Sequence, residues 1–154
     1  MARKSTILQP VSFGQLDGTD SMNCTVRALA NCTDMPITQA KELLAKHGRK
    51  PHDGCKVDVF EAAYQEAGLD FIGFFGSGLQ NMAEEEHSKL HKGCSKRYKG
   101  MTLDTFCKAF KRGSYVVVVA GHALCVRGGM IIDKGAQLGN KSVHMVWKKP
   151  SIVR

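Results

Sequence analysis

The chain has 154 residues, of which 43% are hydrophobic and 23% charged. This length fits one domain with a substantial core, and this balance is typical of a globular protein rather than a disordered one. No run of about 18 apolar residues occurs, and the N-terminal sequence MARKSTILQPVSFG lacks the apolar centre of a signal peptide. We therefore expect a single domain over residues 1–154, with no membrane partner, in the cytoplasm or in a particle assembled there.

The chain is strongly basic, with a formal net charge of +8. Basic residues gather between His87 and Lys111, and again at Lys148, Lys149 and Arg154. A net charge of this sign favours encounters with anionic partners. A solvated basic surface is the simpler interpretation of the pattern, and contact with nucleic acid through that surface is the alternative.

Six cysteines occur without the paired spacing of zinc ribbons and without the density of a small secreted disulfide scaffold. They are Cys24, Cys32, Cys55, Cys94, Cys107 and Cys125. We expect reduced thiols, most of them packed in the core as small hydrophobic side chains.

The N-terminal segment, residues 1–22, is polar and is interrupted by proline and glycine, so we expect no long element before a turn at residues 17–22. From there the sequence NCTVRALANC places apolar residues at helical spacing. The pattern predicts a helix that starts at Cys24, within two residues, with Asp20, Ser21 or Asn23 as its N-cap.

Three further helices are predicted by the 3.6-residue period. The first runs from Ile37 to a glycine stop at Gly48, and the second covers residues 57–67. Another is expected from Leu103 onward, with Thr102 as its cap.

Strands are predicted at residues 69–75 and, more strongly, after Ser114. The sequences SYVVVVAGHALCVRGGMIID and SVHMVWKK are β-branched and broken by Gly-Gly, as in antiparallel strands joined by tight turns. Residues 76–100 have little period and form a basic, glycine-rich insertion. Helices first and strands last favour an α+β fold, in which N-terminal helices pack on a C-terminal antiparallel sheet.

Cys24 is the candidate nucleophile because a helix N-terminus stabilises a thiolate. The turn before it could bring the Cys24 backbone N–H together with a side-chain donor to form an oxyanion hole, and Asn23 and Asp20 are the candidates for that donor. An N-cap role is an equally good interpretation of both of those side chains.

His122 is the candidate base, since it lies in an apolar strand pattern beside Gly121, which leaves room for the approach of another group. Asp133 ends the next strand of the predicted hairpin and could orient the imidazole. Taken singly, each of these three residues could be an ordinary structural one. The pattern of a cysteine on a helix start, a histidine on a strand and an aspartate on the adjoining strand favours a catalytic triad.

A zinc site is the competing interpretation for another group of residues. His87, His91 and Cys94 have helical spacing, and Cys55 or His52 could complete a tetrahedral set. Because no fourth ligand is clearly marked, we assign neither a metal nor a cofactor to the chain.

Two blocks of the sequence resemble a known group of proteins. DSMNCTVRALA is similar to the D-x-x-[DN]-C-x-V-R-A-[LI]-A block of phage and prophage proteins of papain-like cysteine-peptidase fold, and GSYVVVVAGHALCVRGGMIID is similar to their G-x-Y-[IV]-V…G-H…V-x-x-G-x-[IV]-x-D block. The resemblance covers most of residues 20–133. NCTVRA is also similar to the N-C-x-x-R-A of ovarian-tumour-type deubiquitinases.

The resemblance implies a papain-like hydrolase with Cys24, His122 and Asp133 as its triad and with Asp20 or Asn23 near the oxyanion site. It implies a protein or peptide substrate and a place in the host cytoplasm or in the virion. The alternative from a different class is an inactive papain-like scaffold that binds a host factor or nucleic acid.

Overall fold

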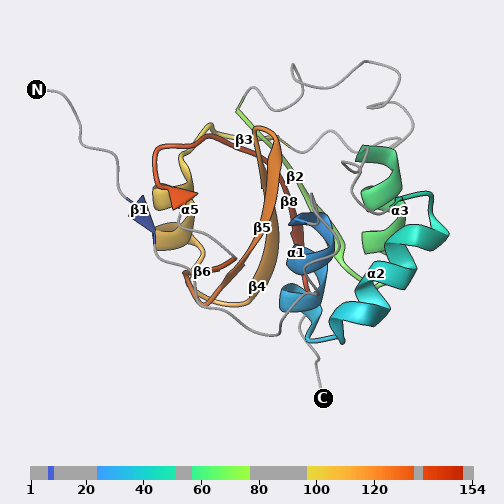
Figure 1. Ribbon diagram of the computed structural model, residues 1–154. Helices are drawn as coiled ribbons and strands as arrows, with labels where there is room; N and C mark the ends of the chain where they lie inside the picture. The colour runs from blue at the N-terminus through green and yellow to red at the C-terminus, as the bar shows by residue number, and fades with distance from the viewer. Residues whose placement is uncertain (1–6, 9–23, 51–56, 77–96, 134–136, 151–154) are drawn as a thin grey trace, which may run out of the picture.

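The computed structural model describes residues 7–8, 24–50, 57–76, 97–133 and 137–150 of the chain (Figure 1). Its helices are α1 (Cys24–Thr33), α2 (Ile37–Lys46), α3 (Val57–Glu66) and α5 (Leu103–Ala109). Its strands are β1 (Ile7–Leu8), β2 (Asp70–Phe75), β3 (Arg97–Tyr98), β4 (Ser114–Val119), β5 (His122–Arg127), β6 (Met130–Ile132), β7 (Gln137–Leu138) and β8 (Val143–Lys148). None of the described helices is both long and apolar enough to cross a membrane.

The described strands form a six-stranded sheet in the order β3-β2-β8-β4-β5-β6, and β1 pairs separately with β7. Every neighbouring pair in the larger sheet is antiparallel except β2 and β3, which run parallel. The α+β class and the antiparallel character of the C-terminal strands are therefore confirmed. The chain departs from a simple division into helices first and strands last, because β2 and β3 both precede α5 and belong to the same sheet.

Two tight hairpins place the strands β4, β5 and β6 side by side. Val119 pairs with His122, so that only residues 120–121 form the first turn. The second turn is Gly128–Gly129, with φ angles of 58° and 77°. Residues other than glycine rarely adopt this left-handed backbone region. Two consecutive residues in it match the twist of a two-residue hairpin. The Gly-Gly pair thus fixes the return from β5 to β6.

The sheet carries an apolar cluster on each face. Helices α1, α2 and α3 cover one face, where Val26 and Leu29 of α1 pack in one cluster with Val116 and Cys125 (Figure 1). The short helix α5 covers the other face, where Leu103 and Phe106 join the cluster of Val117, Leu124 and Val126. The periodicity of α5 predicts its inward face, but it carries no signal for the side of the sheet on which the helix lies.

The predicted helices agree with the structure to within one or two residues at most ends. The helix α1 begins at Cys24, and Thr102 caps α5 by accepting a hydrogen bond from the backbone N–H of Thr105 at 3.3 Å. The strand β3 was not predicted, since two residues inside a charged, glycine-rich stretch produce no periodic pattern. The predicted N-caps of α1 and the turn at residues 17–22 lie outside the described residues.

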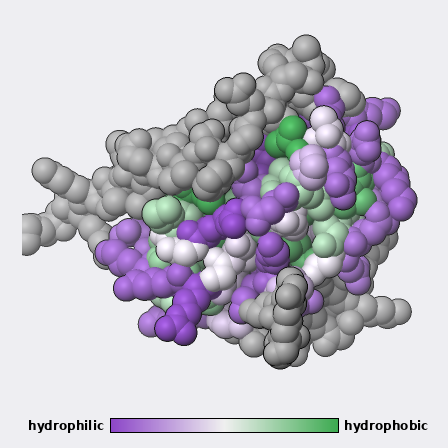
Figure 2. Space-filling model, turned by 90° about the horizontal axis from the view of Figure 1, so that it is seen from below, coloured by the Kyte–Doolittle hydropathy of each residue, from purple (hydrophilic) through white to green (hydrophobic). Residues whose placement is uncertain are grey.

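Hydrophilic residues cover much of the described surface on the face shown in Figure 2, where apolar residues form smaller areas between them. Met130, with 55% of its surface exposed, is the large hydrophobic residue that stands out on the described part of the chain. The described surface therefore has the mixed character expected of a globular domain.

Candidate active site

Cys24 is the first residue of α1, and its side chain is half-buried. The helix is held against the sheet by residues such as Val26 and Leu29, both fully buried. The thiol lies within hydrogen-bonding reach of the His122 side chain and of the backbone of Ala123. The first backbone N–H groups of a helix have no partner within the helix, so this end of α1 favours negative charge on the sulfur.

His122 and Asp133 come together through the register of the β5–β6 hairpin. Cys125 pairs with Ile132, so residue 124 lies opposite Asp133, and His122 is two residues further along the same strand. Such diagonal neighbours on one face of an antiparallel pair are within reach of long side chains. The Nε2 atom of His122 lies 2.6 Å from Oδ2 of Asp133, whose side chain is only 3% exposed.

The three predicted triad residues therefore lie in one continuous chain of contacts, from Cys24 through His122 to Asp133. Because Nε2 of His122 is engaged by the carboxylate, Nδ1 is the ring nitrogen left to face the thiol. This division of the two nitrogens is the arrangement that a base needs when one partner orients it and the other gives up a proton.

Electrostatics at the site favour the charged forms of both the thiol and the imidazole. Burial by itself would raise the pKa of Cys24, but hydrogen bonds from His122 and the Ala123 backbone, with the charges of His122 and Arg27, lower it below its ordinary value. The hydrogen bond to Asp133, followed by that to Cys24, raises the pKa of His122 to about 9. The contacts at the site therefore stabilise a thiolate next to an imidazolium relative to the two neutral groups.

The other described cysteines have a different environment. Burial and the nearby charge of Asp104 raise the pKa of Cys107 to about 11. A hydrogen bond to Cys32, together with burial, raises the pKa of Cys125 far above the ordinary range. Cys32 and Cys125 are both fully buried. Their burial fits packing roles, which leaves Cys24 as the thiol suited to nucleophilic attack among the described residues.

Arg27 is a site residue to which the sequence analysis gave no role. It lies one turn after Cys24 on α1, and its Nη2 atom is 3.7 Å from Oδ1 of Asp133. Residues three apart on a helix share a face. That spacing, a basic residue one turn beyond the candidate nucleophile, is the signal from which the position could have been noticed.

Several predicted residues lie outside the described part of the chain. The oxyanion candidates Asp20 and Asn23 are among them, as are all five residues considered for zinc: His52, Cys55, His87, His91 and Cys94. Within the described residues no group of three or more histidine, cysteine, aspartate or glutamate side chains could hold a metal ion.

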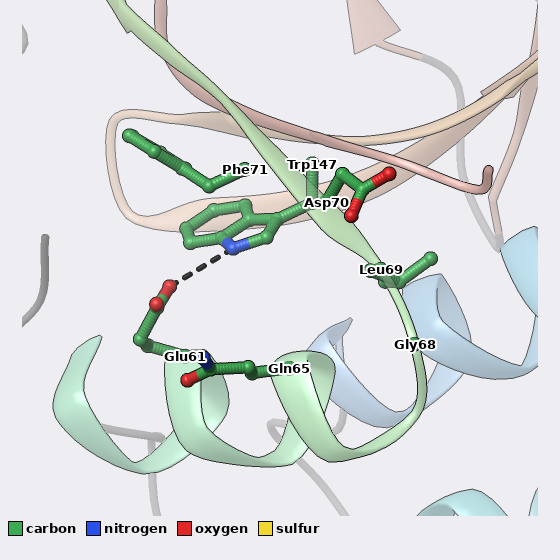
Figure 3. A pocket seen from close by; sticks show the side chains of 7 residues that line it. All are labelled: Glu61, Gln65, Gly68, Leu69, Asp70, Phe71 and Trp147. Atoms are coloured by element: carbon green, nitrogen blue, oxygen red, sulfur yellow. Dashed lines mark hydrogen bonds between the residues drawn. The ribbon is translucent and has the colours of Figure 1, made fainter. Parts of the chain in front are cut away.

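A separate hollow of about 250 Å³ lies at the opposite end of the sheet, between α3 and the strands β2 and β8 (Figure 3). Its wall includes Glu61, which accepts a hydrogen bond of 2.9 Å from Nε1 of Trp147. Trp147 is 1% exposed and packs edge-on against Phe60 and Tyr64, which confirms that it belongs to the core. None of the predicted triad residues lines this hollow.

Comparisons with known proteins add no relative to this picture. No protein-family model, no curated protein and no solved structure matches the chain. The geometry of the site is therefore the basis on which a function can be assigned.

Proposed function

We propose that this chain is a thiol hydrolase, which cleaves amide, isopeptide or ester bonds in a protein or peptide substrate with Cys24, His122 and Asp133. The observation that carries the proposal is the 2.6 Å contact between His122 and Asp133, made by a histidine that also bonds the thiol at the start of α1. Cys24 comes from α1, His122 from β5 and Asp133 from the position directly after β6, so chance packing is a poor explanation for their convergence.

In the proposed reaction the Cys24 thiolate attacks the carbonyl carbon of the substrate and forms a tetrahedral intermediate. The imidazolium of His122 then donates its proton to the leaving amine or alcohol as the carbon–heteroatom bond breaks. A water molecule, deprotonated by His122, attacks the resulting thioester and releases the acid, which restores the thiol–imidazole pair. The backbone N–H groups at the start of α1 are suited to stabilise the oxyanion.

Asp133 has two roles in this scheme. Its Oδ2 atom accepts a hydrogen bond from Nε2 of His122, which keeps Nδ1 directed to the thiol. Its negative charge also stabilises the imidazolium, the form that must protonate the leaving group. Because the carboxylate is almost fully buried, its field acts with little solvent screening.

We further propose that the fold is papain-like and the protein phage-encoded, acting in the host cytoplasm or in the virion. Support comes from the two sequence blocks that contain Cys24 and His122, and from a cysteine-bearing helix packed against an antiparallel sheet that bears the histidine.

A binding scaffold without activity is the second candidate function. It is favoured by the net charge of +8 and by exposed basic residues such as Lys108, Lys111 and Arg112. A protein of this kind would bind nucleic acid with an affinity that falls steeply with salt and survives the change Cys24→Ala.

An activated ester distinguishes the two candidates without knowledge of the natural substrate. With p-nitrophenyl acetate the full-length chain should release a burst of nitrophenolate and carry the acetyl group on Cys24, as located by mass spectrometry. Cys24→Ala and His122→Ala should abolish the burst, whereas Cys107→Ala should retain it. Acetylation of another cysteine in preference to Cys24, or an undiminished burst in Cys24→Ala, would count against the enzyme.

A further inference from the structure

Arg27 connects two members of the proposed triad. It lies on the same face of α1 as Cys24, and its Nη2 atom approaches Oδ1 of Asp133 to 3.7 Å. The other carboxylate oxygen, Oδ2, is the one bound by His122 at 2.6 Å. The buried carboxylate thus has a separate cationic partner for each of its oxygens.

The contact of Arg27 with Asp133 is an ion pair and not a hydrogen bond, because 3.7 Å exceeds the range of N–H···O bonds. Two further guanidinium nitrogens, Nε and Nη1, are buried and have no hydrogen-bond partner in the part of the chain that the structure describes. Leaving buried donors unsatisfied costs stability. Stabilisation of the fold is therefore a poor explanation for the buried guanidinium. Its positive charge next to Asp133 is the better one.

The positive charge of Arg27 balances the net charge of the reactive site. The reactive form of the site has a thiolate on Cys24, an imidazolium on His122 and a carboxylate on Asp133. These three groups together carry one net negative charge, which a half-buried site tolerates poorly. Adding Arg27 makes the four-residue cluster neutral.

We propose that Arg27 is a positioning residue that neutralises Asp133 and thereby sets the pH range over which the Cys24–His122 ion pair exists. The inference rests on the proposed thiol hydrolase function, since it concerns the ion pair that this function requires. Arg27 acts through the charges of its neighbours and has no contact with a substrate in this scheme.

Among the described residues, the elements packed around α1 supply no other charge that competes for this role. Besides the four residues of the cluster, the titratable or charged side chains described on α1, α2, α3, β4, β5 and β8 are Cys32, Lys41, Glu42, Lys46, Asp58, Glu61, Tyr64, Glu66, Tyr115, Cys125, Arg127, His144 and Lys148. Arg127 is bound to Asp34 at the far end of α1, and Lys46 to Glu66 on α3. None of these side chains is among the groups that shift the pKa of Cys24, whereas Arg27 is one of them.

The Cys24–His122 ion pair exists between an acid limit, where the thiolate is protonated, and an alkaline limit, where the imidazolium loses its proton. Loss of the Arg27 charge should move both limits in the same direction. The uncompensated negative charge makes the Cys24 thiol harder to deprotonate, which moves the acid limit to higher pH. The same charge makes the His122 imidazolium harder to deprotonate, which moves the alkaline limit to higher pH as well. A nearby charge typically moves such limits by about one pH unit or more. Looser packing alone would lower the rate without moving both limits together.

The test is the pH dependence of the rate at which iodoacetamide alkylates Cys24 in the full-length protein, followed by mass spectrometry of the Cys24 peptide. In wild type we expect a plateau of fast alkylation across neutral pH. Its acid limit is the pH at which the thiolate is protonated, and its alkaline limit is the pH at which His122 loses its proton and the alkylation rate changes again. In Arg27→Met and Arg27→Gln both limits should rise by about one pH unit. In Arg27→Lys, which keeps the charge, they should stay close to those of wild type.

Each result has a definite meaning. If wild-type Cys24 reacts only as an ordinary thiol, with a rate that rises through the usual thiol range, the hydrolase proposal fails, and the role of Arg27 fails with it. If wild type has the plateau but both neutral variants keep its limits, only the role of Arg27 is overturned. Near-ultraviolet circular dichroism establishes whether the variants fold, and failure of both neutral variants to fold would overturn the proposal by showing that Arg27 maintains the fold.

Discussion

Replacing Asp133 by Asn removes the negative charge next to His122 while keeping nearly the same side-chain shape. The His122 pKa stands at about 9 against an ordinary value of 6.5, a rise of about 2.5. At about 1.4 kcal/mol for each pKa unit, the site stabilises the imidazolium by about 3 to 4 kcal/mol. The hydrogen bond to Asp133 is the largest cause of the rise, and the charge of the same carboxylate adds to it.

The sign of the effect follows from the direction of the shift. A raised pKa means that the ring holds its proton up to about pH 9, and without the carboxylate it should lose that proton earlier. The alkaline limit of the plateau, where loss of the His122 proton changes the rate of Cys24 alkylation by iodoacetamide, should therefore fall by about 1 to 2 pH units in Asp133→Asn. The neutral variants of Arg27 should move the alkaline limit in the opposite direction, to higher pH. The two sets of variants therefore separate the effect of the negative charge from that of the positive charge.

A matched control comes from Asp70→Asn, because Asp70 is an exposed carboxylate on β2, away from the site. It should leave the pH profile unchanged. An alkaline limit in Asp133→Asn that stays within about 0.3 pH unit of wild type, in a variant with an unaltered circular dichroism spectrum, would refute the account of the His122 environment.

Three further predictions concern activity and stability. Cys24→Ala should abolish the p-nitrophenyl acetate burst yet change the unfolding free energy by less than about 1 kcal/mol, because the side chain is only half-buried; a loss of several kcal/mol in urea denaturation would show a structural role instead. Glu61→Ala should cost about 1 to 3 kcal/mol in the same assay, since the buried Nε1 of Trp147 loses its acceptor, and an unchanged midpoint would contradict this. Gly129→Ala should cost at least about 1 kcal/mol more than Gly121→Ala. Both glycines have positive φ, but the added Cβ meets a backbone carbonyl oxygen at 2.8 Å only at Gly129, and equal costs would disprove the argument.

Much of the fold could be predicted because its elements carry strong periodic patterns. The run of β-branched residues in β4 and β5, with Gly-Gly after them, determines two hairpins and therefore the proximity of His122 and Asp133. A hairpin is a local structure, so its register follows from the turn length and the alternation of side chains. The candidate site could be predicted to this extent from short-range sequence alone.

The parts that could not be predicted depend on contacts between segments far apart in the chain. The insertion of β8 between β2 and β4 joins strands about 70 residues apart, and no local pattern encodes that order. The parallel pairing of β3 rests on two residues, Arg97 and Tyr98. The role of Arg27 could not be read from its spacing either, because it depends on where the hairpin places Asp133 against α1.

The central claim is that Cys24 and His122 form an ion pair near neutral pH, and the ultraviolet absorbance of the thiolate tests it most directly. The difference in absorbance between wild type and Cys24→Ser reports the charge on this one sulfur as the pH is varied. We predict that the thiolate signal is already present at about pH 7 and disappears only in acid. A signal that is absent at that pH and emerges only through the ordinary range of a free thiol would contradict the account.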